Sequence, residues 1–316
     1  MKTKLSNKYL FLIDEDSSQE KKIDENLIFN DIRYISLWPG DLRSFYLKNN
    51  HSGKIAGICR FYCENYIARS PYKAPFASIF LFEDIEFSII RSFIRLIVKY
   101  LKQQKIKKIY LKHYPNFYSF LNAEKLLTAL LFERFEITKT DINHYLKISD
   151  NTFESSVHHM QRRRINKCIR LNYNFTVHSN NEIKYLFKKI CEFRRQKNIP
   201  VNITPREIEK LASMFPDHYK FFSISDKERI IATTCIVKVN SETLYNFLPA
   251  SDEEYKTSSP MVFLIKNIYE YAQKNHFQFL DLGISSINNR PQYTLINFKE
   301  RIGGITGVKF TFEKNV

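Results

Sequence analysis

Hydroxyl and cationic side chains gather in the last quarter of this 316-residue chain. The run Lys256-Thr257-Ser258-Ser259-Pro260 directly precedes an apolar, helix-like stretch, and Lys299 and Arg301 follow later. The amides in the first turn of a helix point outward at the positive end of its dipole, so such an end attracts anions. The sequence therefore predicts a site for a phosphate-bearing ligand, contacted by Thr257, Ser258, Ser259, Lys299 and Arg301. An exposed lysine is the alternative interpretation of Lys299.

Two titratable side chains fall on predicted strands that flank this helix. Tyr245 lies in the strand 244–248 and Asp281 in the strand 277–282, where either could exchange a proton with a substrate. We expect Asp281 to act as a base or to hold a substrate amine; the alternative is a buried carboxylate that accepts backbone hydrogen bonds from the turn at Gly283. Tyr255, in the intervening loop, could donate to a leaving thiolate or simply pack on the surface.

The sequence lacks the residue patterns of metal-dependent and of nucleophilic catalysis. The chain has no CxxC and no HExxH, so no metal site is predicted. His113 and the pair His158-His159 have no partners at catalytic spacing, and no Ser-His-Asp or Cys-His set can be assembled. The five cysteines have no regular spacing, which indicates a reducing compartment and predicts a cytoplasmic protein.

The charge of the chain indicates the kind of partner. It has 49 Lys and Arg residues against 33 Asp and Glu, a formal net charge of +16, which favours nucleic acid, phosphorylated ligands or acidic headgroups. The most apolar predicted helix, near residues 87–101, is interrupted by Arg91, Arg95 and Lys99. We therefore expect no membrane span.

The predicted elements that would position these side chains are a strand, a loop, a helix and a second strand. Ser259 is a favourable N-cap and Pro260 a favourable first helical residue, because proline lacks the amide hydrogen that this position cannot use. The helix then has an apolar stripe at Met261, Ile265, Ile268 and Ala272. One face of this helix is therefore expected to cover a core.

The first half of the chain repeats this order. Strands are predicted at 54–66 and 77–82, a helix at about 87–103 and a strand at 107–112. Residues 100–106 and 271–277 both lead from a helix into a strand, which indicates a structural duplication. We predict an α+β protein of two domains, 1–150 and 151–316, each a mixed, mostly antiparallel sheet flanked by helices.

A basic helix is predicted near the start of the second domain. It carries five positive charges on one side, from Arg162, Arg163, Arg164, Lys167 and Arg170. Such a row is commonly a solvated helix face. The alternative is a phosphate-binding strip for tRNA or a docking face for an acyl-carrier protein.

The pattern of the second half resembles a known family. Strand, loop, helix and a strand ending in Asp281-Leu282-Gly283, followed by Phe298-Lys299-Glu300-Arg301-Ile302-Gly303-Gly304, is similar to the Fem-like branch of the GNAT acyltransferases, which includes the BioF2-like acetyltransferases. The resemblance covers residues 152–312 and extends to the first 150 by architecture. It implies tandem GNAT-like domains, with the donor site in the second and Lys299 at a donor phosphate.

The resemblance also implies an activity, N-acyl transfer from acyl-CoA or an acyl-carrier protein to an amine. No permanently bound cofactor is expected. The acyl carbonyl would meet a strand amide near residues 246–248, with Asn246 and Tyr255 as substrate contacts. Ordinary GNAT enzymes have a glycine-rich pyrophosphate loop before the helix, whereas residues 251–259 contain no glycine.

Two alternative functions remain open at this stage. One is aminoacyl-tRNA-dependent addition to a cell-wall precursor, as in Fem enzymes. The basic helix and the missing glycines favour this alternative. Against it, residues 172–225 leave no room for the long helical arm of typical tRNA-using members. The other alternative is an anion-binding module that keeps the fold without turnover.

Overall fold

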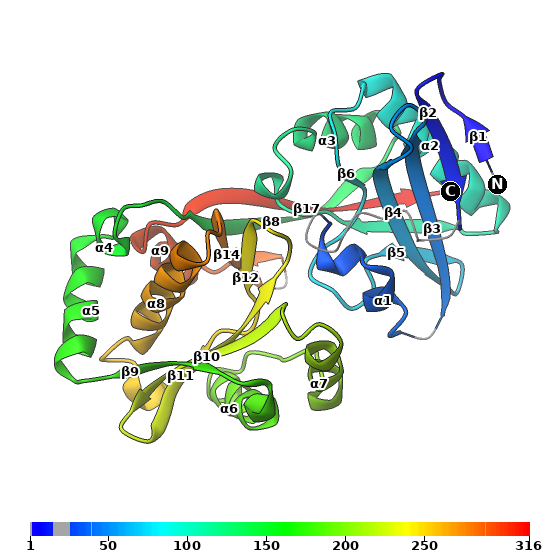
Figure 1. Ribbon diagram of the computed structural model, residues 1–316. Helices are drawn as coiled ribbons and strands as arrows, with labels where there is room; N and C mark the ends of the chain where they lie inside the picture. Colours follow the sequence, from blue (N-terminus) through cyan, green and yellow to red (C-terminus); the bar gives the residue numbers. More distant parts are fainter. Residues whose placement is uncertain (1, 15–25, 39, 288) are drawn as a thin grey trace. The chain divides into compact units, whose positions relative to one another are not determined.

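The computed structural model describes residues 2–14, 26–38, 40–287 and 289–316 (Figure 1). The chain divides into two compact units, Met1–Ile142 together with Gly307–Val316, and Asn143–Thr306. This partition differs from the predicted domains 1–150 and 151–316 in two places. Residues 143–150 group with the second unit, because the end of a long strand pairs there, and the C-terminal strand returns to the first unit.

The first unit is built on a mostly antiparallel sheet. Its strand order is β1-β2-β3-β4-β5-β7-β17, with β6 also on β4, and only the β5–β7 pair among these is parallel. The elements of this unit are β1 (Lys2–Lys4), β2 (Tyr9–Ile13), η3 (Ile28–Asn30), α1 (Ile32–Ile35), β3 (Asp41–Asn49), β4 (Ile55–Glu64), β5 (Ile67–Ser70), β6 (Phe80–Leu81), α2 (Phe87–Gln103), β7 (Lys108–Lys112), η4 (Asn116–Tyr118), α3 (Ala123–Phe132), and most of β8 (Glu136–Lys147) and β17 (Ile305–Asn315).

The second unit has a sheet in the order β8-β14-β12-β11-β10-β9, with β13 also on β11. The β12–β14 pair is parallel and the other pairs are antiparallel. Its further elements are α4 (Phe153–Ser156), α5 (His159–Arg170), β9 (Asn174–His178), η5 (Asn180–Glu182), α6 (Ile183–Gln196), α7 (Pro205–Met214), β10 (Tyr219–Asp226), β11 (Arg229–Lys238), β12 (Thr243–Asn246), β13 (Ala250–Ser251), η6 (Glu253–Tyr255), α8 (Pro260–Lys274), β14 (Phe279–Ile284), β15 (Ser286–Ile287), β16 (Arg290–Pro291) and α9 (Tyr293–Arg301).

Helix α8 occupies one side of the second sheet and helices α6 and α7 the other (Figure 1). The core beneath α8 contains Leu264 and Ile268 from the helix and Leu244 and Leu280 from β12 and β14. Local sequence supports the helices on the opposite side: at the start of α7, Thr204 and Glu207 form a reciprocal capping box ahead of Pro205. Each face of this sheet is therefore covered.

The two units repeat one arrangement of elements. In the first, β4 pairs with β5 and β6, β5 runs parallel to β7, and α2 follows β6. In the second, β11 pairs with β12 and β13, β12 runs parallel to β14, and α8 follows β13. The matching order supports the predicted duplication, and the mixed sheets flanked by helices confirm the predicted α+β fold class. In the described residues, no helix combines the length and the apolar character needed to cross a membrane.

The core beneath α8 should dominate the stability of the second unit. Leu264 is fully buried, whereas Leu171 is 44% exposed. We expect Leu264→Ala to lower the free energy of unfolding by about 2–5 kcal/mol, because it leaves a cavity. The matched change Leu171→Ala should cost no more than about 0.5 kcal/mol. Urea unfolding measures both, and equal losses would contradict the assigned core.

Candidate functional site

The parallel pairing between β12 and β14 ends at the penultimate residue of β12 and midway along β14. It consists of Thr243 with Phe279, Leu244 with Leu280, and Tyr245 with Asp281. Beyond that last pair, β12 and its continuation follow β11. β14 continues along β8 across an irregularity between Asp281 and Gly283. The two predicted titratable residues therefore form the last pair before the strands separate.

Tyr245 and Asp281 lie on the face of the sheet opposite α8. Leu244 and Leu280 belong to the core under α8, and successive strand residues point to opposite faces. Burial raises the pKa of the Tyr245 hydroxyl above its usual range, and the nearby Asp281 carboxylate raises it further. Tyr245 is therefore a protonated donor at neutral pH.

Asp281 is completely buried and held by two hydrogen bonds to one oxygen. Its Oδ1 accepts from the side-chain amide of Asn143 at 2.9 Å and from the backbone amide of Gly283 at 2.7 Å. Gly283 has φ +73°, which an L side chain rarely adopts. This is the geometry of the alternative interpretation, a carboxylate bonded to the Gly283 turn. The role of Asp281 as a base stays a prediction.

Lys299 is the buried residue of α9, with 5% of its surface exposed. Its Nζ donates to the carbonyl oxygens of Gly283 at 2.8 Å and Ile284 at 2.9 Å, at the end of β14. Burial lowers the pKa of the ammonium to about 7, and the Asp281 carboxylate opposes that shift. Near neutral pH, Lys299 can therefore both give and take a proton.

This placement corrects the expectation that Lys299 contacts a donor phosphate at the start of α8. The ammonium is directed to backbone carbonyls of β14 and is neither exposed nor aimed outward. The backbone of Lys299 packs closely against Gly304, because a Cβ at position 304 would lie 2.5 Å from the Lys299 carbonyl oxygen. An ammonium has three donors, and Lys299 uses two of them within the part of the chain that the structure describes.

His144 lies beside Lys299 and was not singled out by the sequence. It is fully buried on β8, and its Nδ1 lies 3.1 Å from the Ser285 hydroxyl oxygen. Its Nε2 is buried and has no hydrogen-bond partner among the described residues. Burial and the charge of Lys299 lower the pKa of His144 to about 4, so the ring is neutral at pH 7. A polar Asn143-His144 pair within a buried strand was the available signal.

Arg194, on α6, is a second residue that the sequence did not indicate. Its Nη2 donates to the Pro200 carbonyl at 3.2 Å, and its buried Nε has no partner in the described part of the chain. Burial lowers its pKa, and the Tyr245 hydroxyl lies close enough to oppose that shift. A partly buried guanidinium with no carboxylate partner among the described residues is able to receive an anionic group of a ligand.

Two of the amides that the sequence predicted to be bare in the turn before α8 are occupied. The amide of Ser258 donates to the Tyr255 carbonyl at 3.0 Å, and that of Ser259 donates to Lys256 at 3.3 Å. Ser259 does precede the helix that starts at Pro260, but its φ is +56° and its side chain makes no capping hydrogen bond. Ser259 is therefore the N-cap residue, as predicted, but its side chain does not cap the helix.

The carbonyls of this turn are also engaged. Lys167 Nζ of α5 donates to the Thr257 carbonyl at 3.2 Å, and Cys168 Sγ donates to the Ser258 carbonyl at 3.2 Å. Ser258 is buried as a result, whereas Thr257 is exposed. The backbone amides of Ser258 and Ser259 are therefore not available to a phosphate. The contact predicted for Thr257 stays a prediction.

Most amides of the span expected to bind an acyl carbonyl are occupied as well. Those of Phe247 and Leu248 both donate to the Cys235 carbonyl, at 3.0 and 3.4 Å, and Pro249 has none. The side-chain oxygen of Asn246 accepts from the Thr234 hydroxyl at 2.6 Å, while its side-chain nitrogen bonds to no described residue. Asn246 is the one of these residues that keeps a donor for a substrate.

Tyr255 and Arg301 do not join the cluster around Lys299. The Tyr255 hydroxyl donates to Asp226 at 3.2 Å, and Arg229 lies over its ring at 5.2 Å. The expected donation to a leaving group is therefore replaced by an internal bond. The Arg301 side chain is exposed, and its carbonyl accepts from the amide of His158 at 2.8 Å.

The cluster that the structure brings together consists of Asp281, Lys299, Tyr245, His144 and Arg194. It offers proton donors and an acceptor, with an unpaired positive charge at its side. No group of three or more His, Cys, Asp or Glu side chains within the described ranges is placed to hold a metal ion. The arrangement fits proton transfer and the stabilisation of negative charge.

Comparison with known proteins gives a result only at the level of structure. No protein-family model and no curated protein sequence matches the chain. Among solved structures, FemX is 11% identical and aligns over 93% of this chain and 94% of its own, with a TM-score of 0.69. L-PGS from Bacillus licheniformis is also 11% identical, over 86% of this chain and 83% of its own, with a TM-score of 0.57.

A third similar structure is itself a tandem GNAT protein. The tandem GNAT protein from the clavulanic acid biosynthesis pathway is 7% identical, over 87% of this chain and 83% of its own, with a TM-score of 0.52. At these identities the likeness establishes the fold. The fold that the resemblance implied, two GNAT-like domains in tandem, is thereby confirmed.

The lowered pKa of Lys299 predicts how the free energy of unfolding depends on pH. Its value of about 7 lies below the ordinary 10.5, so the unfolded chain binds more protons between these pH values and stability rises with pH there. Between pH 6 and 9 the wild type should gain about 2–3 kcal/mol in free energy of unfolding relative to Lys299→Met. Urea titrations of both proteins measure this gain, and a difference that stays constant with pH would contradict the buried ammonium.

Proposed function

We propose that this protein transfers an acyl or aminoacyl group from an activated carrier to an amine. The observation that carries the proposal is the separation of β12 from β14 at the Tyr245–Asp281 pair, beside the buried Lys299. The tandem GNAT fold supports it, because the same two strands are those that the family resemblance assigns to the acyl donor. The cytoplasm remains the expected compartment.

The proposed reaction needs one proton to move. The amine nitrogen attacks the acyl carbon, the bond from that carbon to the carrier oxygen or sulfur breaks, and the amine proton passes to the leaving atom. Lys299 populates both protonation states near pH 7, so it can receive that proton and return it. Once Lys299 holds that proton, its third N–H can stabilise the oxyanion until the proton passes to the leaving atom.

The neighbouring side chains have supporting roles in this proposal. Burial keeps Tyr245 protonated, and the charge of Asp281 adds to that effect. Asp281 also favours the charged form of Lys299. Asn246 can donate to the substrate through its side-chain nitrogen. Arg194 is suited to an anionic group on the donor or the acceptor.

The donor can belong to two classes, and one observation favours the second. An acyl-CoA or acyl-carrier protein is the donor expected from ordinary GNAT enzymes. The amides of Ser258 and Ser259 are occupied, however, and no glycine precedes α8, so support for a pyrophosphate cradle is weak. An aminoacyl ester, as in aminoacyl-tRNA, does not require that cradle. The segment 172–225 forms β9, η5, α6, α7 and β10. It therefore does not contain the long helical arm expected of typical tRNA-using members, which is the argument against this donor.

The experiment offers both donors together with a panel of amines. We expect product from acetyl-CoA or from a mixture of aminoacyl-tRNAs, detected by mass spectrometry. Lys299→Met should lower the transfer rate at least about 100-fold, because the proton carrier is lost. Lys274→Met, at an exposed lysine in the last turn of α8, is the matched control and should keep the rate.

Two results would contradict the proposal, and a third would change its favoured donor. Full activity in Lys299→Met would remove the assigned proton carrier. Activity with neither donor, together with no thermal stabilisation by coenzyme A or aminoacyl-tRNA, would favour a module without turnover. Thermal stabilisation by coenzyme A alone would exclude the aminoacyl ester as the favoured donor.

Arg194 gives a second test that separates binding from chemistry. We expect Arg194→Gln to raise KM about tenfold for the substrate that carries the anionic group and to change kcat little, because the charge orients that substrate. Arg195→Gln, at the exposed neighbouring arginine, is the control. An unchanged KM for both substrates would show that Arg194 contacts neither.

A further inference from the structure

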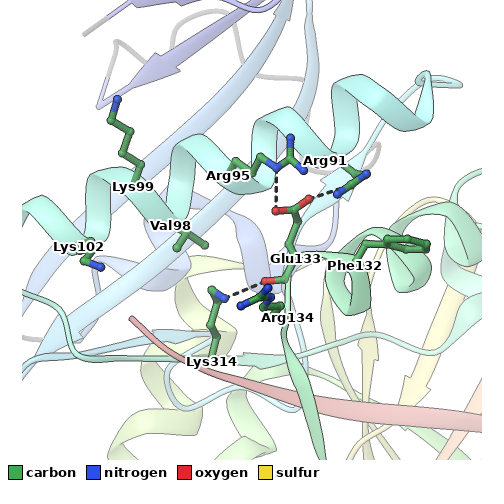
Figure 2. A pocket seen from close by; sticks show the side chains of 9 residues that line it. All are labelled: Arg91, Arg95, Val98, Lys99, Lys102, Phe132, Glu133, Arg134 and Lys314. Carbon is green, nitrogen blue, oxygen red and sulfur yellow. Dashed lines mark hydrogen bonds and ion pairs between the residues drawn. The ribbon is translucent and has the colours of Figure 1, made fainter.

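The first unit has a basic surface groove that the transfer reaction does not use. It has a volume of about 540 Å³ and is formed by α2, the end of α3 and β17. Figure 2 shows the side chains that line it. This basic groove consists of Arg91, Arg95, Val98, Lys99, Lys102, Phe132, Glu133, Arg134 and Lys314. Six cations and one carboxylate give it a net charge of +5.

The single carboxylate of the basic groove is already neutralised. Glu133 Oε1 accepts from Arg91 at 2.8 Å and its Oε2 from Arg95 at 2.9 Å, both reaching across from α2 (Figure 2). Lys314 donates to the Glu133 carbonyl at 2.9 Å. These bonds fix the floor of the groove.

Three cations of the basic groove remain without a counter-ion. The side chains of Lys99, Lys102 and Arg134 are exposed and make no ion pair or hydrogen bond with any residue that the structure describes. Burial lowers the pKa of Lys314, and the charges of Arg134 and Lys102 lower it further, whereas Glu133 and Glu136 oppose them. The uncompensated positive charge favours a polyanionic occupant.

The cations on α2 are spaced for an extended ligand. Arg91, Arg95, Lys99 and Lys102 follow each other at four, four and three residues, so they share one face of the helix. At 1.5 Å per residue they extend over about 16 Å. Each strand of a duplex carries one phosphate for about every 3.4 Å of the helix axis, and the phosphates of an extended single strand lie farther apart. The row is therefore long enough to meet several phosphates. A single phosphate or lipid headgroup would leave most of the row unused.

An aromatic ring lies at the edge of the basic groove. Phe132 is 61% exposed, although it is large and apolar, and its ring meets that of Phe87 edge to face at 6.0 Å. The Arg91 guanidinium lies 5.1 Å from the Phe132 ring centre. An exposed ring beside a row of cations is the combination that binds a single strand, by stacking on a base and pairing with its phosphates.

We propose that the basic groove of the first unit binds a single strand of nucleic acid through its phosphate backbone, with one base stacked on Phe132. The inference does not rest on the transferase proposal, because all nine residues of the groove belong to the first unit. A lipid bilayer is a poorer occupant, because its flat surface cannot fill a groove.

The test measures binding of a fluorescent polyuridine of about 12 nucleotides to the full chain by anisotropy, between about 50 and 200 mM salt. We expect Lys99→Gln with Lys102→Gln to weaken binding at least tenfold. The slope of log affinity against log salt should fall by about 1.4, since each lost phosphate contact removes about 0.7 on a single strand. Phe132→Ala should weaken binding about tenfold and leave the slope unchanged.

The controls remove the same charge elsewhere. Lys54→Gln with Lys210→Gln changes two exposed lysines outside the groove, and Arg163→Gln with Arg170→Gln changes the exposed face of α5. Both should leave most of the affinity and the slope intact. Three outcomes would overturn the proposal: no binding at low salt, a loss that follows the α5 variant instead, or Lys99- and Lys102-dependent binding to phosphatidylglycerol vesicles without binding to RNA. Because the readout is binding, a failed transfer assay leaves this test unaffected.

Discussion

The second unit depends on a lysine ammonium held at the end of a strand. Lys299 donates to the carbonyls of Gly283 and Ile284, beyond the point where β14 leaves β12. A pKa of about 7 means that burial disfavours the charge by about 5 kcal/mol relative to water, even with both bonds and the Asp281 carboxylate nearby. The charged and neutral forms of Lys299 therefore have similar free energies near pH 7, and a small change in the surroundings can change which form is favoured.

Much of the architecture could be predicted from local pattern. The helix predicted at 87–103 is α2, and the apolar stripe from Met261 to Ala272 lies within α8. Helix α9 could not be found in this way, since its buried residue is the lysine. Strand β17 could not either, because it pairs with β7, nearly 200 residues away, and depends on contacts that no local pattern records.

The candidate site was predicted in part. The strands that carry Tyr245 and Asp281 were assigned correctly, and the two residues are neighbours in the sheet. The start of α8 was interpreted from its hydroxyls and its proline. The amides of Ser258 and Ser259 bond within the turn, however, and the carbonyls of Thr257 and Ser258 bond to α5, which depends on tertiary packing. Arg194 was missed because burial without a carboxylate partner cannot be read from residue type. His144 was missed although the polar Asn143-His144 pair in the strand offered a signal.

The most direct test of the account is an NMR titration of the Lys299 side chain, with the signal assigned by its loss in Lys299→Met. The account predicts a midpoint near pH 7, because burial outweighs the two carbonyl bonds and the Asp281 charge. A midpoint at the ordinary 10.5 would contradict it, since the lysine would then stay charged at neutral pH and could not carry the proton of acyl transfer.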